Sequence, residues 1–349
     1  MGIISSMAKQ RLYVGIDVGG QSIKGGVVDE AGQPLSEIDL TTEAHHGNDH
    51  FLGRVDLAIE RAVEAAKLNM SQISSIGVAT PGTMDIKRGL ILEPPNMRPL
   101  KNVAVREHVH NRFRIPTTFQ NDANAAAYGE YWVGAGRGAD SVVLFTLGTG
   151  IGCGIIVHDA IIEGEHSHGA EVGHIIVQMF DGRMCGCGQP GHLEAYASAR
   201  SIVKRAKGLL ASARPSSLRA TALAQRNNME GLTVGEEETL AARHASLIFQ
   251  AAAAEDELAK EIVEEVAYAL AVGAVNMMHT INPDRIIFGG GMTAAGTPFL
   301  ARIQHHVQRL AFPVPAQQTQ IMYAELGTKA GFIGSAGCAR RDYLRRAKG

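Results

Sequence analysis

Two segments of this chain share one pattern: an apolar β-rich run, a glycine-rich turn and a second apolar run. Residues 12–17 and 22–28 flank Gly19 and Gly20, and residues 141–147 and 153–157 flank Gly148, Gly150 and Gly152. Apolar runs on both sides of a glycine turn predict β-hairpins. The repeat is weak, but its presence in both halves predicts a duplicated fold with a cleft between the halves.

The length of the chain agrees with two halves. At about 150 residues per domain, 349 residues predict two domains, and a hydrophobic content of 45% is enough for a sizeable core. We expect a smaller N-terminal domain of residues 1–117 plus 331–349, to which the last helix returns. A larger C-terminal domain of residues 118–330 would carry a polar, loop-rich surface insertion at residues 206–240.

Charge and composition exclude several partners. The net charge is −2 and aromatic residues make up only 5%, which disfavours nucleic acid and anionic membranes as partners. There is also no apolar run of the roughly 18 residues that a membrane span needs. Four cysteines are too few for a disulfide scaffold in a chain of this length, and a reducing, cytoplasmic location is expected.

The segment 174–194 has the most specific pattern. Cys185 and Cys187 stand one residue apart, with His174 before them and His192 after them. Two thiolates and two imidazoles form the tetrahedral Cys₂His₂ set of a structural Zn²⁺ site. The alternative, two ordinary loop histidines, does not account for the C-x-C between them. Glu171 and Glu194 bracket this metal loop and could accept hydrogen bonds from sugar hydroxyls, although each alone could be a solvated charge.

The glycine turns could bind phosphate. Glycine lets backbone N–H groups approach phosphate oxygens, and Asp17 could hold Mg²⁺. An ordinary turn with a solvated Asp17 is equally compatible with this pattern. The second turn, with Thr146 and Thr149, would form its partner, and Gly289, Gly290 and Gly291 could make room for a flat ring or simply begin a helix.

Asn121 and Asp122 stand at a predicted strand-to-helix junction. An aspartate in this position is commonly a helix N-cap. It could also act as a general base, taking the proton of a hydroxyl that attacks the γ-phosphate of a nucleotide.

Together these segments resemble the ROK family of sugar kinases and sugar-responsive repressors. The resemblance covers about residues 13–337, and its most specific part runs from Glu171-Val172-Gly173-His174 to Glu194. The family has a third Cys where this chain has His192. The resemblance implies an α/β, two-domain, actin-like ATPase (ribonuclease H-like) fold, with mixed five-stranded sheets and the ligands in the cleft.

The resemblance also implies roles for individual residues. Asp122 would be the catalytic base for a sugar hydroxyl, normally at C6. The sugar-lining residues would be Gly82, Asn96, Asn121, Asp122, Glu171, His174 and Glu194. The phosphate and adenosine residues would be Asp17, Gly19, Gly20, Gln21, Lys24, Thr146, Gly148, Thr149, Gly150, Gly289, Gly290 and Gly291.

These residues predict an ATP- and Mg²⁺-dependent hexose 6-kinase with a structural zinc, most simply a glucokinase. The alternatives are a kinase for fructose, N-acetylmannosamine or N-acetylglucosamine, and a non-catalytic sugar sensor. Family repressors carry a DNA-binding domain before the first hairpin, for which the residues before Leu12 are too few. The expected partners are sugar and nucleotide, and a homodimer is expected because family members often form one.

Overall fold

The computed structural model describes residues 11–94, 97–212, 214–223 and 234–347. The chain divides into two compact units. Unit 1 comprises Met1–Val133 and Lys329–Gly349, and unit 2 comprises Gly134–Thr328.

The centre of unit 1 is a five-stranded mixed sheet in the order β3-β2-β1-β4-β7. β1 and β2 form an antiparallel hairpin, whereas β1, β4 and β7 run parallel. Parallel neighbours end at the same edge of a sheet, so the carboxyl ends of these three strands lie together. The strands are β1 (Leu12–Val18), β2 (Ser22–Asp29), β3 (Ile38–Thr41), β4 (Ile73–Thr80) and β7 (Thr117–Asn121). A small ribbon of β5 (Met84–Asp85) and β6 (Leu90–Ile91) follows β4.

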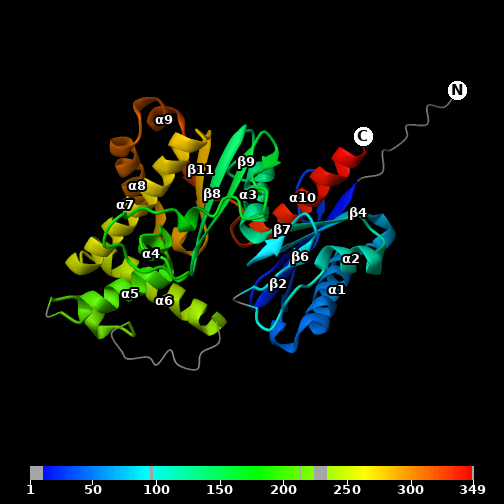
Figure 1. The fold of residues 1–349 in the computed structure, drawn as a ribbon, viewed down its shortest axis with the longest axis horizontal. Helices are drawn as coiled ribbons and strands as arrows, with labels where there is room; N and C mark the ends of the chain where they lie inside the picture. The colour runs from blue at the N-terminus through cyan, green and yellow to red at the C-terminus, as the bar shows by residue number, and fades with distance from the viewer. Residues whose placement is uncertain (1–10, 95–96, 213, 224–233, 348–349) are drawn as a thin grey trace. The chain divides into compact units, whose positions relative to one another are not determined.

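Helices cover both faces of this sheet. Figure 1 shows α1 (Asn48–Ala65) and α2 (Val105–Phe113) on one face and α10 (Ala330–Arg346) on the other. α10 packs very closely, because a Cβ atom on Gly15 of β1 would lie 1.8 Å from the carbonyl oxygen of Phe332. α3 (Asp122–Val133) packs in turn against α10. This packing sets the junction of the compact units after Val133, where the sequence analysis expected it near residue 117.

Unit 2 repeats the topology of unit 1. Its sheet has the order β10-β9-β8-β11-β12, again with an antiparallel hairpin followed by parallel strands. The strands are β8 (Ser141–Leu147), β9 (Ile151–Val157), β10 (Ala160–Ile161), β11 (Arg285–Gly289) and β12 (Gln320–Tyr323). The duplicated α/β architecture predicted from the two glycine turns is therefore confirmed.

The core of unit 2 contains Phe145, Phe288 and Leu193, all fully buried, and the buried face of the long helix α7 (Glu257–Thr280). Around α7 lie α4 (Glu194–Ala197), α5 (Ala199–Leu210), α6 (Val234–Ala253) and α8 (Gly296–Leu310), with α9 (Pro313–Gln318) after α8. The short 3₁₀ helices are η1 (Ala44–His46), η2 (Met70–Gln72), η3 (Val172–His174), η4 (Ser217–Ala220), η5 (Gly291–Ala295) and η6 (Gly327–Lys329).

The segment 206–240 is more helical than the sequence analysis expected. Its first residues complete α5, and Val234 begins the 20-residue helix α6. Residues 213 and 224–233 of this segment lie outside the described part of the chain. Among the described residues, no helix is both long and apolar enough to cross a membrane.

Candidate functional site

Polar residues from three strands lie at the carboxyl edge of the unit 1 sheet, where β1, β4 and β7 end. The parallel register sets Asp17 of β1 beside Ala79 of β4, and Thr80 of β4 beside Asn121 of β7. Gly82 follows β4 with φ 92°, in the left-handed region that favours glycine. In open α/β sheets this edge is where ligands bind. Asn96, also predicted to line the sugar site, lies outside the described residues.

Asp17 stands out electrostatically at this edge. Burial, and to a smaller extent the Asp122 carboxylate, raise its pKa from 3.8 to about 7, and Lys24 across the hairpin opposes the rise. Gly331 of α10 leaves room for this carboxylate, since a Cβ there would lie 2.0 Å from the Asp17 Oδ2 atom. Two carboxylates that influence each other in this way form an acidic pair able to bind a cation or handle a proton.

The side chains of Asn121 and Asp122 accept different hydrogen bonds at the start of α3. The Asn121 Oδ1 atom accepts hydrogen bonds from the backbone N–H groups of Ala123 and Asn124, at 3.0 and 3.1 Å. Asn121 therefore caps α3, a role that the sequence alone could equally have given to Asp122. The Asp122 Oδ1 atom accepts from the Ala123 N–H at 2.8 Å. The helix N-terminus stabilises an ionised carboxylate at this position.

The β1–β2 turn brings Gly19 and Gly20 to the same edge. The Gly19 N–H donates to the Ser22 carbonyl oxygen at 2.8 Å. Thr42 fixes the turn from outside, because its N–H donates to the Gln21 carbonyl at 2.9 Å and its hydroxyl donates to the Gly19 carbonyl at 2.7 Å. The Thr42 side chain is fully buried, so the turn is firmly held.

The second glycine turn, in unit 2, is held by an acidic side chain. The Gly148 N–H donates to the Gly150 carbonyl at 3.0 Å, and the Glu194 Oε2 atom accepts from the Ile151 N–H at 3.0 Å. A Cβ on Gly150 would lie 2.5 Å from the same Glu194 oxygen. Glu194 thus joins the glycine turn to the end of the metal loop.

The third glycine group lies at the neighbouring strand end. Gly289 of β11 pairs with Thr146 of β8, and Gly290 follows with φ 90°. A Cβ on Gly290 would lie 2.5 Å from the Leu147 carbonyl oxygen, so only glycine fits without a shift.

Beside these turns is a cavity of about 230 Å³, lined by Gly148, Gly291, η5 and the α6 side chains Ala245, Ser246 and Phe249. Its mostly small or apolar lining could accommodate a flat, uncharged ring.

The metal loop brings its four predicted ligands together. One ligand atom from each of His174, Cys185, Cys187 and His192 lies within 4.8 Å of all the others. The Sγ atom of Cys187 is 3.2 Å from Nδ1 of His192, and Sγ of Cys185 is 3.8 Å from Nδ1 of His174. Zinc bond lengths in a tetrahedron require a separation of about 3.5 Å between sulfur and nitrogen. The donor set and its spacing therefore fit Zn²⁺.

Glu194 also contacts this cluster. The Cys185 Sγ atom is 3.4 Å from the Glu194 Oε1 atom. Burial, with a smaller contribution from the Glu194 charge, raises the pKa of the Cys185 thiol to about 12. A bound divalent cation would reverse this preference and deprotonate the thiol. One Glu194 oxygen thus faces the glycine turn and the other faces the metal ligands.

Glu171 lies just before η3, and its side chain is exposed. η3 packs directly on the glycine hairpin, because a Cβ on Gly173 would lie 2.2 Å from the Ile151 carbonyl oxygen. Glu171, His174 and Glu194 therefore belong to one local structure in unit 2.

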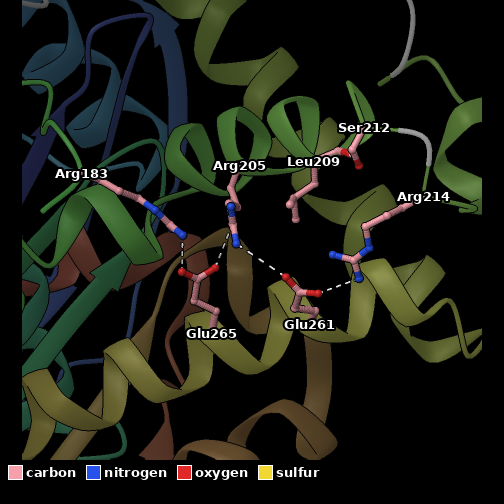
Figure 2. Close-up of polar contacts among 7 residues, drawn as sticks. All are labelled: Arg183, Arg205, Leu209, Ser212, Arg214, Glu261 and Glu265. Atoms are coloured by element: carbon pink, nitrogen blue, oxygen red, sulfur yellow. Dashed lines mark hydrogen bonds and ion pairs between the residues drawn. The ribbon is translucent and has the colours of Figure 1, made fainter. Parts of the chain in front are cut away.

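A ladder of ion pairs fastens the metal loop to α7 and α5 (Figure 2). Arg183 of the loop pairs with Glu265 of α7, which also accepts a hydrogen bond from the Arg205 Nε atom at 3.1 Å. The ladder continues from Arg205 to Glu261 and from Glu261 to Arg214, at 3.6 and 2.7 Å. Arg183 also stacks 4.8 Å from the Tyr196 ring centre.

Comparison with known proteins decides the family. The sequence model of the ROK family matches residues 13–342. The chain belongs to the ROK family. This confirms both the resemblance drawn from the metal loop and glycine turns and the actin-like ATPase fold that it implied.

The ROK relatives include several glucokinases. The glucokinase of Streptomyces coelicolor is 34% identical over 94% of this chain and 98% of its own length. The glucokinase of Halalkalibacterium halodurans is 31% identical over 97% and 98%, respectively. A ROK family glucokinase from Streptomyces griseus, solved in complex with glucose and AMPPNP, is 33% identical, with a TM-score of 0.73 over 95% of this chain and 99% of that one.

Two features of this ROK chain were missed by sequence analysis. The α6 residues that line the cavity follow directly after the segment 206–240, which was expected to be a loop, and only the helical spacing of Ala245 and Phe249 pointed to them. No sequence pattern indicated the ion pair of Arg183, because its partner Glu265 is distant in sequence.

Proposed function

We propose that this ROK-family chain transfers the γ-phosphoryl group of ATP to a hexose hydroxyl, most simply the 6-hydroxyl of glucose. The observation that carries the proposal is the acidic pair at the carboxyl edge of unit 1, where Asp122 begins α3 near Asp17. Glucokinases at 31 and 34% identity over nearly the whole chain support the sugar. The Streptomyces griseus glucokinase, solved with glucose and AMPPNP, supports ATP as the donor.

Asp122 is the proposed general base. Its carboxylate accepts the proton of the sugar hydroxyl as that oxygen attacks the γ-phosphorus, and the bond from phosphorus to the β–γ bridging oxygen breaks to release ADP. The raised pKa of Asp17, about 7, favours its protonated form below that pH in the ligand-free chain. A protonated Asp17 is neutral and places no second negative charge beside the Asp122 carboxylate. An ionised Asp17 is a suitable ligand for the Mg²⁺ that screens phosphate charge.

The unit 2 residues bind and orient the ligands in this proposal. The N–H groups of the turn at Gly148–Gly150 approach the phosphates, and the cavity beside Gly291 receives the adenine. The Glu171 and Glu194 carboxylates accept hydrogen bonds from the remaining sugar hydroxyls, and the His174 ring forms a further hydrogen bond with one of them. The fixed position of Glu194 between the glycine turn and Cys185 makes it a preorganised acceptor.

We further propose that His174, Cys185, Cys187 and His192 hold a structural Zn²⁺. Zinc would fix the metal loop and with it Glu194. Elemental analysis of untagged wild-type protein and of a Cys185→Ser/Cys187→Ser variant tests this. The wild type should contain one more zinc per chain and should melt at a higher temperature. Equal zinc contents would refute the assignment.

A coupled assay of ADP release over a sugar panel tests the main proposal. We expect turnover with glucose, and a dehydrogenase specific for glucose 6-phosphate should detect the product. Preferred turnover with fructose, N-acetylmannosamine or N-acetylglucosamine would reassign the sugar within the same reaction. Replacing ATP with polyphosphate tests the donor. Sugar binding without ADP release from any hexose or N-acetylhexosamine would overturn the kinase proposal.

A further inference from the structure

A second cluster of metal-binding side chains lies in unit 1, around the start of α1. Glu43, His46 and His50 each offer one ligand atom, and these atoms lie within 4.8 Å of one another. The Nε2 atom of His50 is 2.8 Å from the Oε2 atom of Glu43, and the rings of His46 and His50 are 4.8 Å apart. Both histidines are exposed, so an ion could reach the cluster from solvent.

The Glu43 carboxylate is already oriented. Its Oε1 atom accepts a hydrogen bond from the Thr41 hydroxyl at 2.5 Å and lies 3.5 Å from the Arg54 guanidinium. Arg54 is itself held by the Thr41 carbonyl at 2.9 Å. These contacts occupy one carboxylate oxygen and aim the other, Oε2, at His50. Partners of this kind orient the ligands of natural metal sites.

The backbone beneath the cluster is also fixed. Thr42, next to Glu43, is fully buried and makes two hydrogen bonds to the β1–β2 turn. His46 ends η1, and the next residue, Gly47, is the N-cap of α1. Only the exposed His46 and His50 side chains therefore need to rotate when an ion binds, because Glu43 is already oriented, and this keeps the cost of ordering small.

We propose that Glu43, His46 and His50 form a second metal site, which takes a divalent transition ion of the zinc class. Two imidazoles and one carboxylate are the donors of three-ligand zinc sites, in which water completes the shell. Imidazole nitrogens favour Zn²⁺, Cu²⁺, Ni²⁺ and Co²⁺ over Mg²⁺ and Ca²⁺, which prefer oxygen ligands. The site is separate from the metal loop, whose ligands include thiolates and belong to unit 2.

Co²⁺ alone is the probe for this site. Untagged full-length protein is freed of metal by a chelator, titrated with Co²⁺, and analysed for bound cobalt. The variants are His46→Gln and His50→Gln, and the matched control is His45→Gln. His45 is a suitable control because its ring is 4.0 Å from that of His46 but it is not part of the cluster.

We expect the control to bind one more Co²⁺ per chain than His46→Gln or His50→Gln, or to bind that ion at least about tenfold more tightly. The difference should appear in the weak visible bands of cobalt and leave any thiolate-to-cobalt absorption from Cys185 and Cys187 unchanged. It should also persist in millimolar Mg²⁺. Equal cobalt binding by the control and both variants would overturn the proposal, whether or not the metal loop binds zinc and whether or not the protein is a kinase.

Discussion

The two halves of the molecule have the same sheet topology but different residues at the strand ends. In unit 1 two of the three parallel strands have a carboxylate at this end, Asp17 in β1 and Asp122 directly after β7. In unit 2 the equivalent edge carries glycines and hydroxyls, such as Gly148, Gly290 and Thr149. One scaffold thus provides two kinds of site: one that can handle a proton or a cation, and one that offers backbone N–H groups and space.

The two glycine turns are also held differently. Thr42 fixes the unit 1 turn through the backbone carbonyls of Gly19 and Gln21. The carboxylate of Glu194 contacts the unit 2 turn and reaches the metal loop as well. Glu194 therefore connects the unit 2 turn to the proposed zinc ligands, whereas the buried Thr42 holds the unit 1 turn.

The largest effect is expected from Asp122→Asn, which tests the assignment of chemistry to unit 1. Loss of a general base should lower kcat by about 10²–10⁴-fold, measured by ADP release. Sugar affinity should change far less, since an amide still forms hydrogen bonds. Asp39→Asn, an exposed carboxylate on edge strand β3, is the control and should keep full activity. Retention of most activity in Asp122→Asn would remove Asp122 from the base role.

The pH dependence of stability should reveal the desolvated carboxylate of Asp17. The unfolded chain loses this proton near pH 3.8 and the folded chain near pH 7, so the folded state holds the proton more tightly. The contribution to stability is thus complete below about pH 4 and is lost as the pH rises through about 7. Each tenfold difference in proton affinity between the two states corresponds to about 1.4 kcal/mol, a value that solvent screening reduces.

Asp17→Asn should remove this decline, so that the variant becomes more stable than the wild type at about pH 8 but not at about pH 4. Urea unfolding of both proteins across this range is the measurement. A constant difference between them at all pH values would contradict the raised pKa of Asp17.

Gly290→Ala tests the packing of glycine turns in unit 2. The positive φ and the 2.5 Å approach to the Leu147 carbonyl should cost about 1–3 kcal/mol of stability. Gly291→Ala is the neighbouring control, because a Cβ there has no atom within 4 Å. Denaturant unfolding should separate the two variants. Equal stability would show that the turn can shift to admit a side chain.

The smallest effect should come from Arg183→Met, which tests the link between metal loop and sugar binding. Each ion pair here is partly exposed and contributes only about 0–1 kcal/mol. We expect the KM for sugar to rise a few-fold with kcat nearly unchanged. Arg214→Met, at the other end of the same ladder, should leave the KM unaltered. Identical behaviour of the two variants would mean that Arg183 has no positioning role.

The family, the duplicated sheets and the clustering of the four proposed zinc ligands could be anticipated because their signals are local. The spacing of Cys185 and Cys187 and the two glycine turns are readable directly from neighbouring residues. The sequence could not predict that Asn121 is the N-cap of α3, since adjacent Asn and Asp are equally good caps. The unit boundary after Val133 depends on packing between α3 and the distant α10, for which the sequence gives no local signal.

The most direct test of the central claim is a crystal structure of the protein with glucose and a non-hydrolysable ATP analogue. The account predicts the Asp122 carboxylate at a hydrogen-bonding distance of about 2.6–3.2 Å from the sugar 6-hydroxyl, with that oxygen facing the γ-phosphorus. An Asp122 carboxylate that contacts no sugar hydroxyl, or a hydroxyl directed away from the phosphorus, would contradict it.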